Sequence, residues 1–256
     1  MRIILTITLV LLLDSCQAQD YCNAKLCPNK RKHIACKNKG SFASTCPEDA
    51  KLLSIDADNQ NLLLQLHNNL RHKLAGGYGK VRLTACRMAT MQWSPELARL
   101  AELNVKQCEM AHDGCRGTAR FQYAGQNIYQ ARYSRGPFPK VDNLLRTGFQ
   151  NWVSEESKTE KDQLKSYPRY NSGPAIGHFT VIANERNVAV GCALAKYRKG
   201  SWTTFLMTCN YAVTNMVDYP VYSDCKKPAT KCKTGTNPNY SALCSVREKV
   251  DYNFQD

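Results

Sequence analysis

The sequence predicts an α+β domain in which helices stack on an antiparallel sheet. The first half of the chain carries apolar residues at helical spacing, in segments that begin near residues 58, 94 and 140. After Gly173-Pro174 the apolar residues alternate instead, within segments rich in β-branched and aromatic side chains. Roughly 160 residues between two cysteine-containing ends are enough for one core of ordinary domain size.

The first predicted helix runs from about Asp58 to Leu74 and ends before Gly76-Gly77. His67 lies on the apolar stripe of this helix, so it is predicted to be a buried packing residue and not a ligand. The stripe consists of leucines at i, i+3 and i+4 spacing, namely Leu62, Leu63, Leu66, Leu70 and Leu74.

The second helix is predicted to begin at Ser94-Pro95-Glu96. These residues supply an N-cap, a proline in the first turn and an acidic side chain near the positive end of the helix dipole. The helix carries Leu97, Leu100 and Ala101 on its apolar face, and we expect Cys108 in its last turn.

The third helix is predicted from about Lys140 to Glu156, and it places a carboxylate on its apolar face. Glu155 follows Trp152 by three residues and shares the face of Leu144 and Leu145. An unpaired buried carboxylate costs several kcal/mol, so Glu155 should meet a cation, a donor-rich partner or a water-filled cavity. The alternative is a glutamate at the helix end that reaches solvent.

A short strand is predicted at Gln126 to Ala131, and a hairpin later in the chain. The hairpin pairs Val188 to Leu194 with Trp202 to Ala212 through a glycine turn at Tyr197 to Ser201. Cys192 and Cys209 lie on the two arms, where a cross-strand disulfide can form.

Residues 1–18 are predicted to be a secretory signal peptide. Arg2 is followed by an aliphatic run to Leu13, and the small residues ending at Ala18 suit signal peptidase. The run of about a dozen apolar residues is shorter than the ~20 that a membrane-spanning helix needs, and no similar run recurs. We therefore expect a secreted monomer without a membrane anchor.

Cysteines and positive charge are concentrated at the two ends of the mature chain. The chain has 13 cysteines, and removal of Cys16 with the leader leaves an even number, which suits complete pairing outside the cell. We divide the remainder into a basic N-terminal arm (residues 19–57), a core domain (residues 58–222) and a C-terminal tail (residues 223–256).

The net charge of +14 favours contact with polyanions such as heparan-type glycans, although solubility alone also explains it. No basic motif is interleaved with aromatic residues in the way that nucleic-acid binding requires, so no nucleic-acid partner is expected.

Two separated histidines, His112 and His178, are the candidates for chemistry. Each lies beside turn residues, and if they converge with Glu155 they form a cation site or an acid–base pocket. No G-x-S-x-G or H-E-x-x-H signature accompanies them, and no nucleophile is identifiable, so no catalytic residue is assigned.

An ordered set of motifs resembles the superfamily of cysteine-rich secretory proteins, antigen 5 and pathogenesis-related proteins (CAP). The resemblance covers about Asp58 to Tyr222, and the cysteine-rich arm is similar to the antigen 5 branch of insect venoms and saliva, fly proteins above all. The motifs are His67-Asn68-x-x-Arg71, Ala111-His112-Asp113-x-Cys115, Gly125-Gln126-Asn127, Trp152-x-x-Glu155, Gly177-His178-Phe179-Thr180, Val190-Gly191-Cys192 and Cys209-Asn210-Tyr211.

The resemblance implies an α-β-α sandwich with a central cleft, in which a tetrad falls on His112, Gln126, Glu155 and His178. Gln126 stands where many members have glutamate, which removes one negative charge. A divalent cation would then be held weakly by His112, His178 and Glu155, and imidazole ligands favour zinc or copper. The alternative is a hydrogen-bonded tetrad without metal.

The resemblance also implies a set of disulfides. It pairs Cys22 with Cys36, Cys27 with Cys115, Cys46 with Cys108, and Cys192 with Cys209. For the remaining cysteines we expect Cys232 with Cys244 and Cys86 with Cys225. Asn239 begins an Asn-Tyr-Ser acceptor sequon for glycosylation.

The function implied by the resemblance is that of a secreted, non-enzymatic protein of the salivary or venom allergen type. It is expected to bind small apolar ligands such as lipids or sterols, and extracellular partners. The alternative is a metal-dependent hydrolase or redox protein that uses His112, Glu155 and His178.

Overall fold

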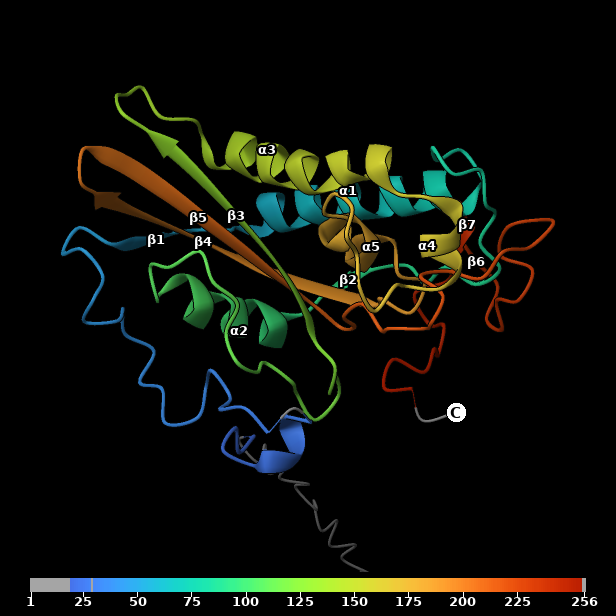
Figure 1. The fold of residues 1–256 in the computed structure, drawn as a ribbon, viewed down its shortest axis with the longest axis horizontal. Helices are drawn as coiled ribbons and strands as arrows, with labels where there is room; N and C mark the ends of the chain where they lie inside the picture. Colours follow the sequence, from blue (N-terminus) through green and yellow to red (C-terminus); the bar gives the residue numbers. More distant parts are fainter. Residues whose placement is uncertain (1–18, 29, 255–256) are drawn as a thin grey trace, which may run out of the picture.

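One sheet forms the middle layer of the protein in the computed structural model, which describes residues 19–28 and 30–254 (Figure 1). The strand order is β1-β4-β5-β3, all antiparallel, with β2 parallel to β4 beside that path. The predicted signal peptide lies outside the described residues. The strands are β1 (Lys51–Leu53), β2 (Gln92–Trp93), β3 (Gly125–Tyr133), β4 (Ala189–Lys199) and β5 (Trp202–Tyr211).

The β4–β5 hairpin is the longest pairing of the sheet and confirms the predicted hairpin. Its strands continue to Lys199 and Trp202, so the turn is shorter than the predicted Tyr197 to Ser201. Gly200 makes this turn possible, since its φ of +61° lies in the left-handed region. Cys192 and Cys209 are direct register partners.

Three helices cover one face of the sheet: α1 (Ala57–Ala75), α3 (Val141–Val153) and α5 (Gly177–Ala183) (Figure 1). Asp56 caps α1 by accepting a hydrogen bond from the Asn59 N–H. Leucines of both long helices are buried in the main core with Trp152 and Phe205, namely Leu63, Leu70, Leu74, Leu144 and Leu145. Leu62, Leu64 and Leu66 of α1 are half-buried. His67 packs among the buried leucines, fully buried, as predicted, and burial lowers its pKa to about 4.

Helix α2 (Pro95–Val105) lies alone on the opposite face, which completes an α-β-α sandwich (Figure 1). Ser94 is its N-cap, as predicted, and accepts from the Leu97 N–H at 3.3 Å. The helix ends earlier than expected, because Cys108 adopts a φ of +55° beyond its C-terminus.

The chain between α3 and β4 differs from the prediction in two ways. The predicted third helix stops at Val153, and a 3-10 helix η2 (Ser154–Lys158) carries Glu155. The region after Gly173-Pro174, expected to be strands, first forms α5. A short helix α4 (Lys161–Lys165) lies between these two segments.

Both ends of the described chain are tied to the sandwich. The arm contains η1 (Ala24–Leu26) and contributes β1 to the sheet, while the tail forms a hairpin of β6 (Thr236–Asn237) and β7 (Tyr240–Cys244) that contacts α1. None of the described helices has the length and apolar character to cross a membrane. The six disulfides join the expected partners: Cys22–Cys36, Cys27–Cys115, Cys46–Cys108, Cys86–Cys225, Cys192–Cys209 and Cys232–Cys244.

Candidate functional site

The two candidate histidines line one cavity of about 340 Å³. His112 comes from the loop between α2 and β3, Gln126 from the beginning of β3, and His178 from the first turn of α5. Asn127 lines the same cavity and holds α5 against β3, because its Nδ2 donates to the His178 carbonyl at 3.0 Å. The fold thus brings together side chains that are 66 residues apart in the sequence.

Glu155 lies directly behind His178 and fixes its ring. One carboxylate oxygen accepts from His178 Nδ1 at 2.7 Å, and the other accepts from the backbone N–H groups of His178 and Phe179 at 2.8 and 3.0 Å. Glu155 is 7% exposed, so it is not a helix-end residue reaching solvent. Of the expected environments for this buried carboxylate, the structure has the donor-rich one.

Gln126 performs the corresponding role for His112. Its Nε2 donates to Asp113 Oδ2 at 2.7 Å and to Asn210 Oδ1 at 3.0 Å, which fixes the direction of the amide. The amide oxygen therefore faces His112 Nδ1, at 2.8 Å. Because this oxygen only accepts, Nδ1 is the nitrogen that carries the proton, and in the neutral ring the lone pair is on Nε2.

Asp113 is a part of the site that sequence reasoning missed. Its side chain is 2% exposed and accepts from Arg116 Nε at 2.9 Å and from Asn104 Nδ2 at 3.2 Å, besides Gln126. The negative charge absent from position 126 is therefore present one hydrogen bond further from His112. The sequence did offer one signal for this role: Asp113 and Arg116 are three residues apart, a spacing that allows the ion pair seen here.

The two rings are arranged alike: in each, Nδ1 is bound to an oxygen acceptor and Nε2 is left for a ligand. This is the outer-shell arrangement that orients metal-binding imidazoles. Two neutral nitrogens suit zinc or copper and leave coordination positions open. Within residues 19–28 and 30–254, however, no three His, Cys, Asp or Glu side chains gather closely enough to hold a metal ion. Glu155, expected as a third ligand, is instead bonded to His178.

Thr214 contributes a hydroxyl to the lining of the cavity, but among the described residues it makes no hydrogen bond to either ring. The hydrogen bonds of the two rings reach Gln126 and Glu155, and in the described chain they reach no hydroxyl or thiol group. Every cysteine among the described residues is in a disulfide. Trp152 flanks His178 with nearly parallel rings, 12° apart, and its Nε1 donates to the Ile128 carbonyl. Trp152 thus limits movement of the ring without adding a reactive group.

Known proteins are similar to this chain in sequence and in architecture. Venom allergen-1 of Aedes aegypti is 40% identical over 95% of this chain and 94% of its own length. The antigen 5 like allergen Cul n 1 of Culicoides nubeculosus is 38% identical over 73% of this chain and 90% of its own length. The crystal structure of NaASP2 with Zn2+ superposes with a TM-score of 0.64 at 22% identity, over 78% of this chain and all of that one, which shows the fold alone.

The family model of the cysteine-rich secretory proteins matches residues 64–211, which span α1 to β5 and include the whole tetrad. The insect relatives carry the match through the arm and the tail. The chain therefore belongs to the CAP family, cysteine-rich secretory proteins, and within it to the antigen 5 branch of venom allergen-like proteins.

Proposed function

We propose that this protein is a secreted antigen 5-like CAP protein that binds a small apolar ligand and extracellular partners and does not catalyse a reaction. The relatives named venom allergens, the fully paired cysteines and the predicted leader support secretion. The absence of a hydroxyl or thiol from the hydrogen bonds that the described chain makes to the two rings supports binding over catalysis.

The observation that carries the apolar ligand is a pocket of about 390 Å³ between β1, β2, α2 and β4. Its walls include Leu53, Ile55, Trp93 and Leu194, and Arg99 and Glu102 add one charge of each sign to the lining. An apolar lining with a few polar groups is typical of small-molecule sites, and it suits a lipid with a polar head or a sterol. The leucines of α1 and α3 do not form this site, because most of them pack in the main core.

Filling this pocket tests the proposal. Ala98 lines it and is half-buried, so Ala98→Phe would occupy the space of a ligand. Ala175→Phe is the matched control, because it adds the same ring at the histidine cavity. We expect native mass spectrometry and titration with a fluorescent fatty acid or sterol to detect micromolar binding in the wild type and the control only. No binding to the wild type would refute the proposal. Loss of binding in the control alone would indicate that the ligand binds in the histidine cavity instead.

A second candidate function is weak binding of a divalent cation at the histidine cavity. It is favoured by the two Nε2 atoms that remain after Gln126 and Glu155 bind the Nδ1 atoms. NaASP2, a protein of the same fold, has been crystallised with Zn2+. Calorimetry with zinc and with copper should show one site that is lost in His112→Ala and in His178→Ala and retained in His72→Ala.

The same variants test a metal-dependent hydrolase or redox protein that uses His112, Glu155 and His178. Such an enzyme needs a cation to activate water or carry electrons, because no hydroxyl or thiol of the described residues is hydrogen-bonded to the rings. We would measure the metal content of protein purified without chelator and then assay the activity of the alanine variants. These two measurements distinguish a metal-dependent enzyme from a binding protein. A stoichiometric metal and an activity that both alanine variants lack would favour the enzyme.

A further inference from the structure

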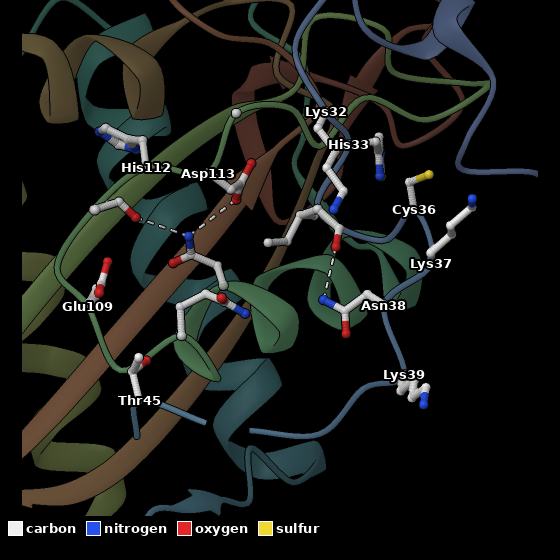
Figure 2. Close-up of a pocket in the computed structure, with 15 residues that line it drawn as sticks. Lys32, His33, Cys36, Lys37, Asn38, Lys39, Thr45, Glu109, His112 and Asp113 are labelled. Atoms are coloured by element: carbon white, nitrogen blue, oxygen red, sulfur yellow. Dashed lines mark hydrogen bonds between the residues drawn. The ribbon is translucent and has the colours of Figure 1, made fainter. Parts of the chain in front are cut away.

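A third cavity, of about 500 Å³, lies between the N-terminal arm and the core (Figure 2). One wall is formed by residues 32–39 and Thr45 of the arm. The other wall is formed by the C-terminal part of α2 and the loop of residues 109–114. His112 lines this cavity as well as the cleft, so its loop separates the two.

The arm wall is positively charged. Lys32, Lys37 and Lys39 line it and are exposed, and none of them forms an ion pair with any residue that the structure describes. On the core wall, the Asp113 carboxylate is already bound by Arg116 and Gln126. The lysines therefore keep their charge available for an anionic ligand, and on the core wall they face one exposed carboxylate, that of Glu109.

The remaining lining is polar. Gln107, Thr45 and Glu109 contribute an amide, a hydroxyl and a carboxylate, whereas Ile34 and Ala111 are its main apolar residues. No Phe, Tyr or Trp lines the cavity to stack on a nucleobase. The cavity thus suits a ligand that carries hydroxyl groups along with its negative charges, and it does not suit a lipid tail.

The arm wall is held in place by the core. The Ile34 N–H donates to the Cys115 carbonyl at 2.8 Å, and Lys106 Nζ donates to the Gly40 carbonyl at 2.6 Å. The disulfides Cys22–Cys36 and Cys27–Cys115 close the arm on itself and onto the core. A ligand would therefore meet backbone positions that are already ordered, which reduces the entropy lost on binding.

Lys37 has an unusual backbone conformation. Its φ of +54° lies in the left-handed region, which costs a residue with a side chain about 1–2 kcal/mol and is easiest for glycine or asparagine. A lysine at this position keeps an exposed cation on the arm wall at the expense of stability.

We propose that this cavity binds a sulfated oligosaccharide, with Lys32, Lys37 and Lys39 facing its sulfate groups and the core wall facing its hydroxyl groups. Sulfated glycans are extracellular polymers that combine these two features. The proposal does not depend on a ligand in the histidine cleft or in the apolar pocket, so it can fail or succeed separately.

The test is calorimetric titration of the full mature protein with a heparin-derived hexasaccharide at 50 and 150 mM salt. The variant is the triple substitution Lys32→Gln, Lys37→Gln, Lys39→Gln. The control removes three exposed lysines of the tail, Lys226→Gln, Lys227→Gln, Lys231→Gln, for the same change in net charge. We expect the arm variant to raise Kd at least tenfold and the control less than twofold, with weaker binding at the higher salt.

Lysine acetylation followed by mass spectrometry provides a readout that does not require a variant to fold. The hexasaccharide should protect Lys32, Lys37 and Lys39 in the wild type and leave the tail lysines reactive. Equal losses in both variants, protection of the tail, or equal affinity for a desulfated hexasaccharide would overturn the proposal. Competition by inorganic sulfate as strong as that by the hexasaccharide would also overturn it, because it would indicate a site for a simple anion.

Discussion

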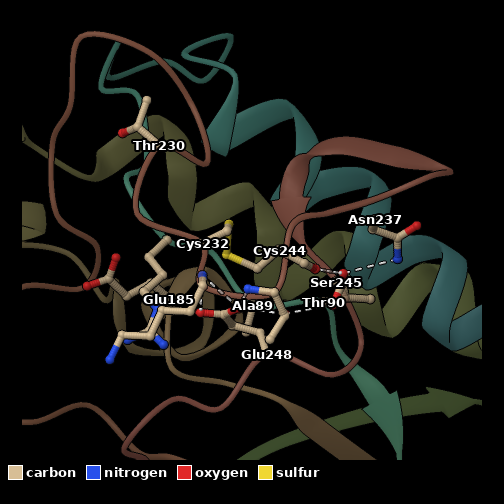
Figure 3. Close-up of a disulfide and its surroundings, with 12 residues drawn as sticks. Ala89, Thr90, Glu185, Thr230, Cys232, Asn237, Cys244, Ser245 and Glu248 are labelled. Atoms are coloured by element: carbon tan, nitrogen blue, oxygen red, sulfur yellow. Dashed lines mark hydrogen bonds and ion pairs between the residues drawn. A yellow bond between two sulfur atoms is a disulfide. The ribbon is translucent and has the colours of Figure 1, made fainter.

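Removal of the Glu248 charge is the sharpest stability test that the structure offers. Glu248 lies in the tail close to the Cys232–Cys244 disulfide, and its side chain is 1% exposed (Figure 3). It accepts hydrogen bonds from the Lys233 and Thr234 N–H groups, from Thr234 Oγ1, and from Arg87 Nε at 2.6 Å. The tail is thereby joined to the core next to the Cys86–Cys225 disulfide.

The magnitude follows from the pKa of this carboxyl group. Burial alone would raise the pKa, but the hydrogen bonds from the Lys233 N–H, the Thr234 hydroxyl and Arg87 outweigh it and lower the pKa from 4.5 to about 2. At 1.36 kcal/mol per pKa unit, the ionised form contributes about 3 kcal/mol to the folded state at neutral pH. Since the folded pKa is the lower one, this contribution is complete above about pH 5 and is lost as the pH falls towards 2.

The assay is urea unfolding of the wild type and Glu248→Gln, with disulfides intact, from pH 2 to 7. We expect the variant to be less stable by about 2–3 kcal/mol at pH 7 and the difference to shrink steadily below pH 5. Glu48→Gln, which removes an exposed carboxylate, is the control and should change stability by less than about 0.5 kcal/mol. A difference that stays constant down to pH 2 would falsify the electrostatic reasoning, since packing alone would then explain it.

Three further predictions concern the core and the cleft. Gln126→Glu would place a second carboxylate against that of Asp113, across a 2.7 Å contact, and raise the pKa of the pair. The Tm of this variant should therefore fall as the pH rises above about 5, and a Tm that does not change with pH would contradict this. Gly191→Ala would place a Cβ 2.2 Å from the Ala98 backbone nitrogen. Denaturant unfolding should therefore show a loss of about 3 kcal/mol or more in the free energy of unfolding, and a loss below about 1 kcal/mol would refute the close packing. Arg71→Met leaves buried carbonyl groups without their donor and should cost about 3 kcal/mol in the same assay, whereas a neutral result would show that water replaces the guanidinium.

Elements with local start and stop signals could be predicted from the sequence. Ser94-Pro95-Glu96 marked the start of α2 because capping is a contact between near neighbours. The burial of Glu155 followed from helical periodicity, even though the residue lies in a 3-10 turn. Its partners could not be predicted, because His178 reaches it through the tertiary placement of α5.

Elements without such signals were missed. Helix α5 has seven residues, too few to show helical periodicity, and its Val181 and Ile182 resemble a strand. Strands β1 and β2 have three and two residues and exist only because β4 provides a partner for them. The hydrogen bond from Gln126 to Asp113 depends on how the loop before β3 folds back, which no local pattern encodes.

The Cys86–Cys225 disulfide would hold the chain together after cleavage by a protease. Tyr170 lies in an irregular loop between α4 and α5 and is 87% exposed, so the chain is accessible to cleavage there. Of the six disulfides, Cys86–Cys225 alone joins the segments before and after that loop. A nicked molecule would therefore remain one covalent unit with its folded surface intact, and it would separate into two fragments only on reduction.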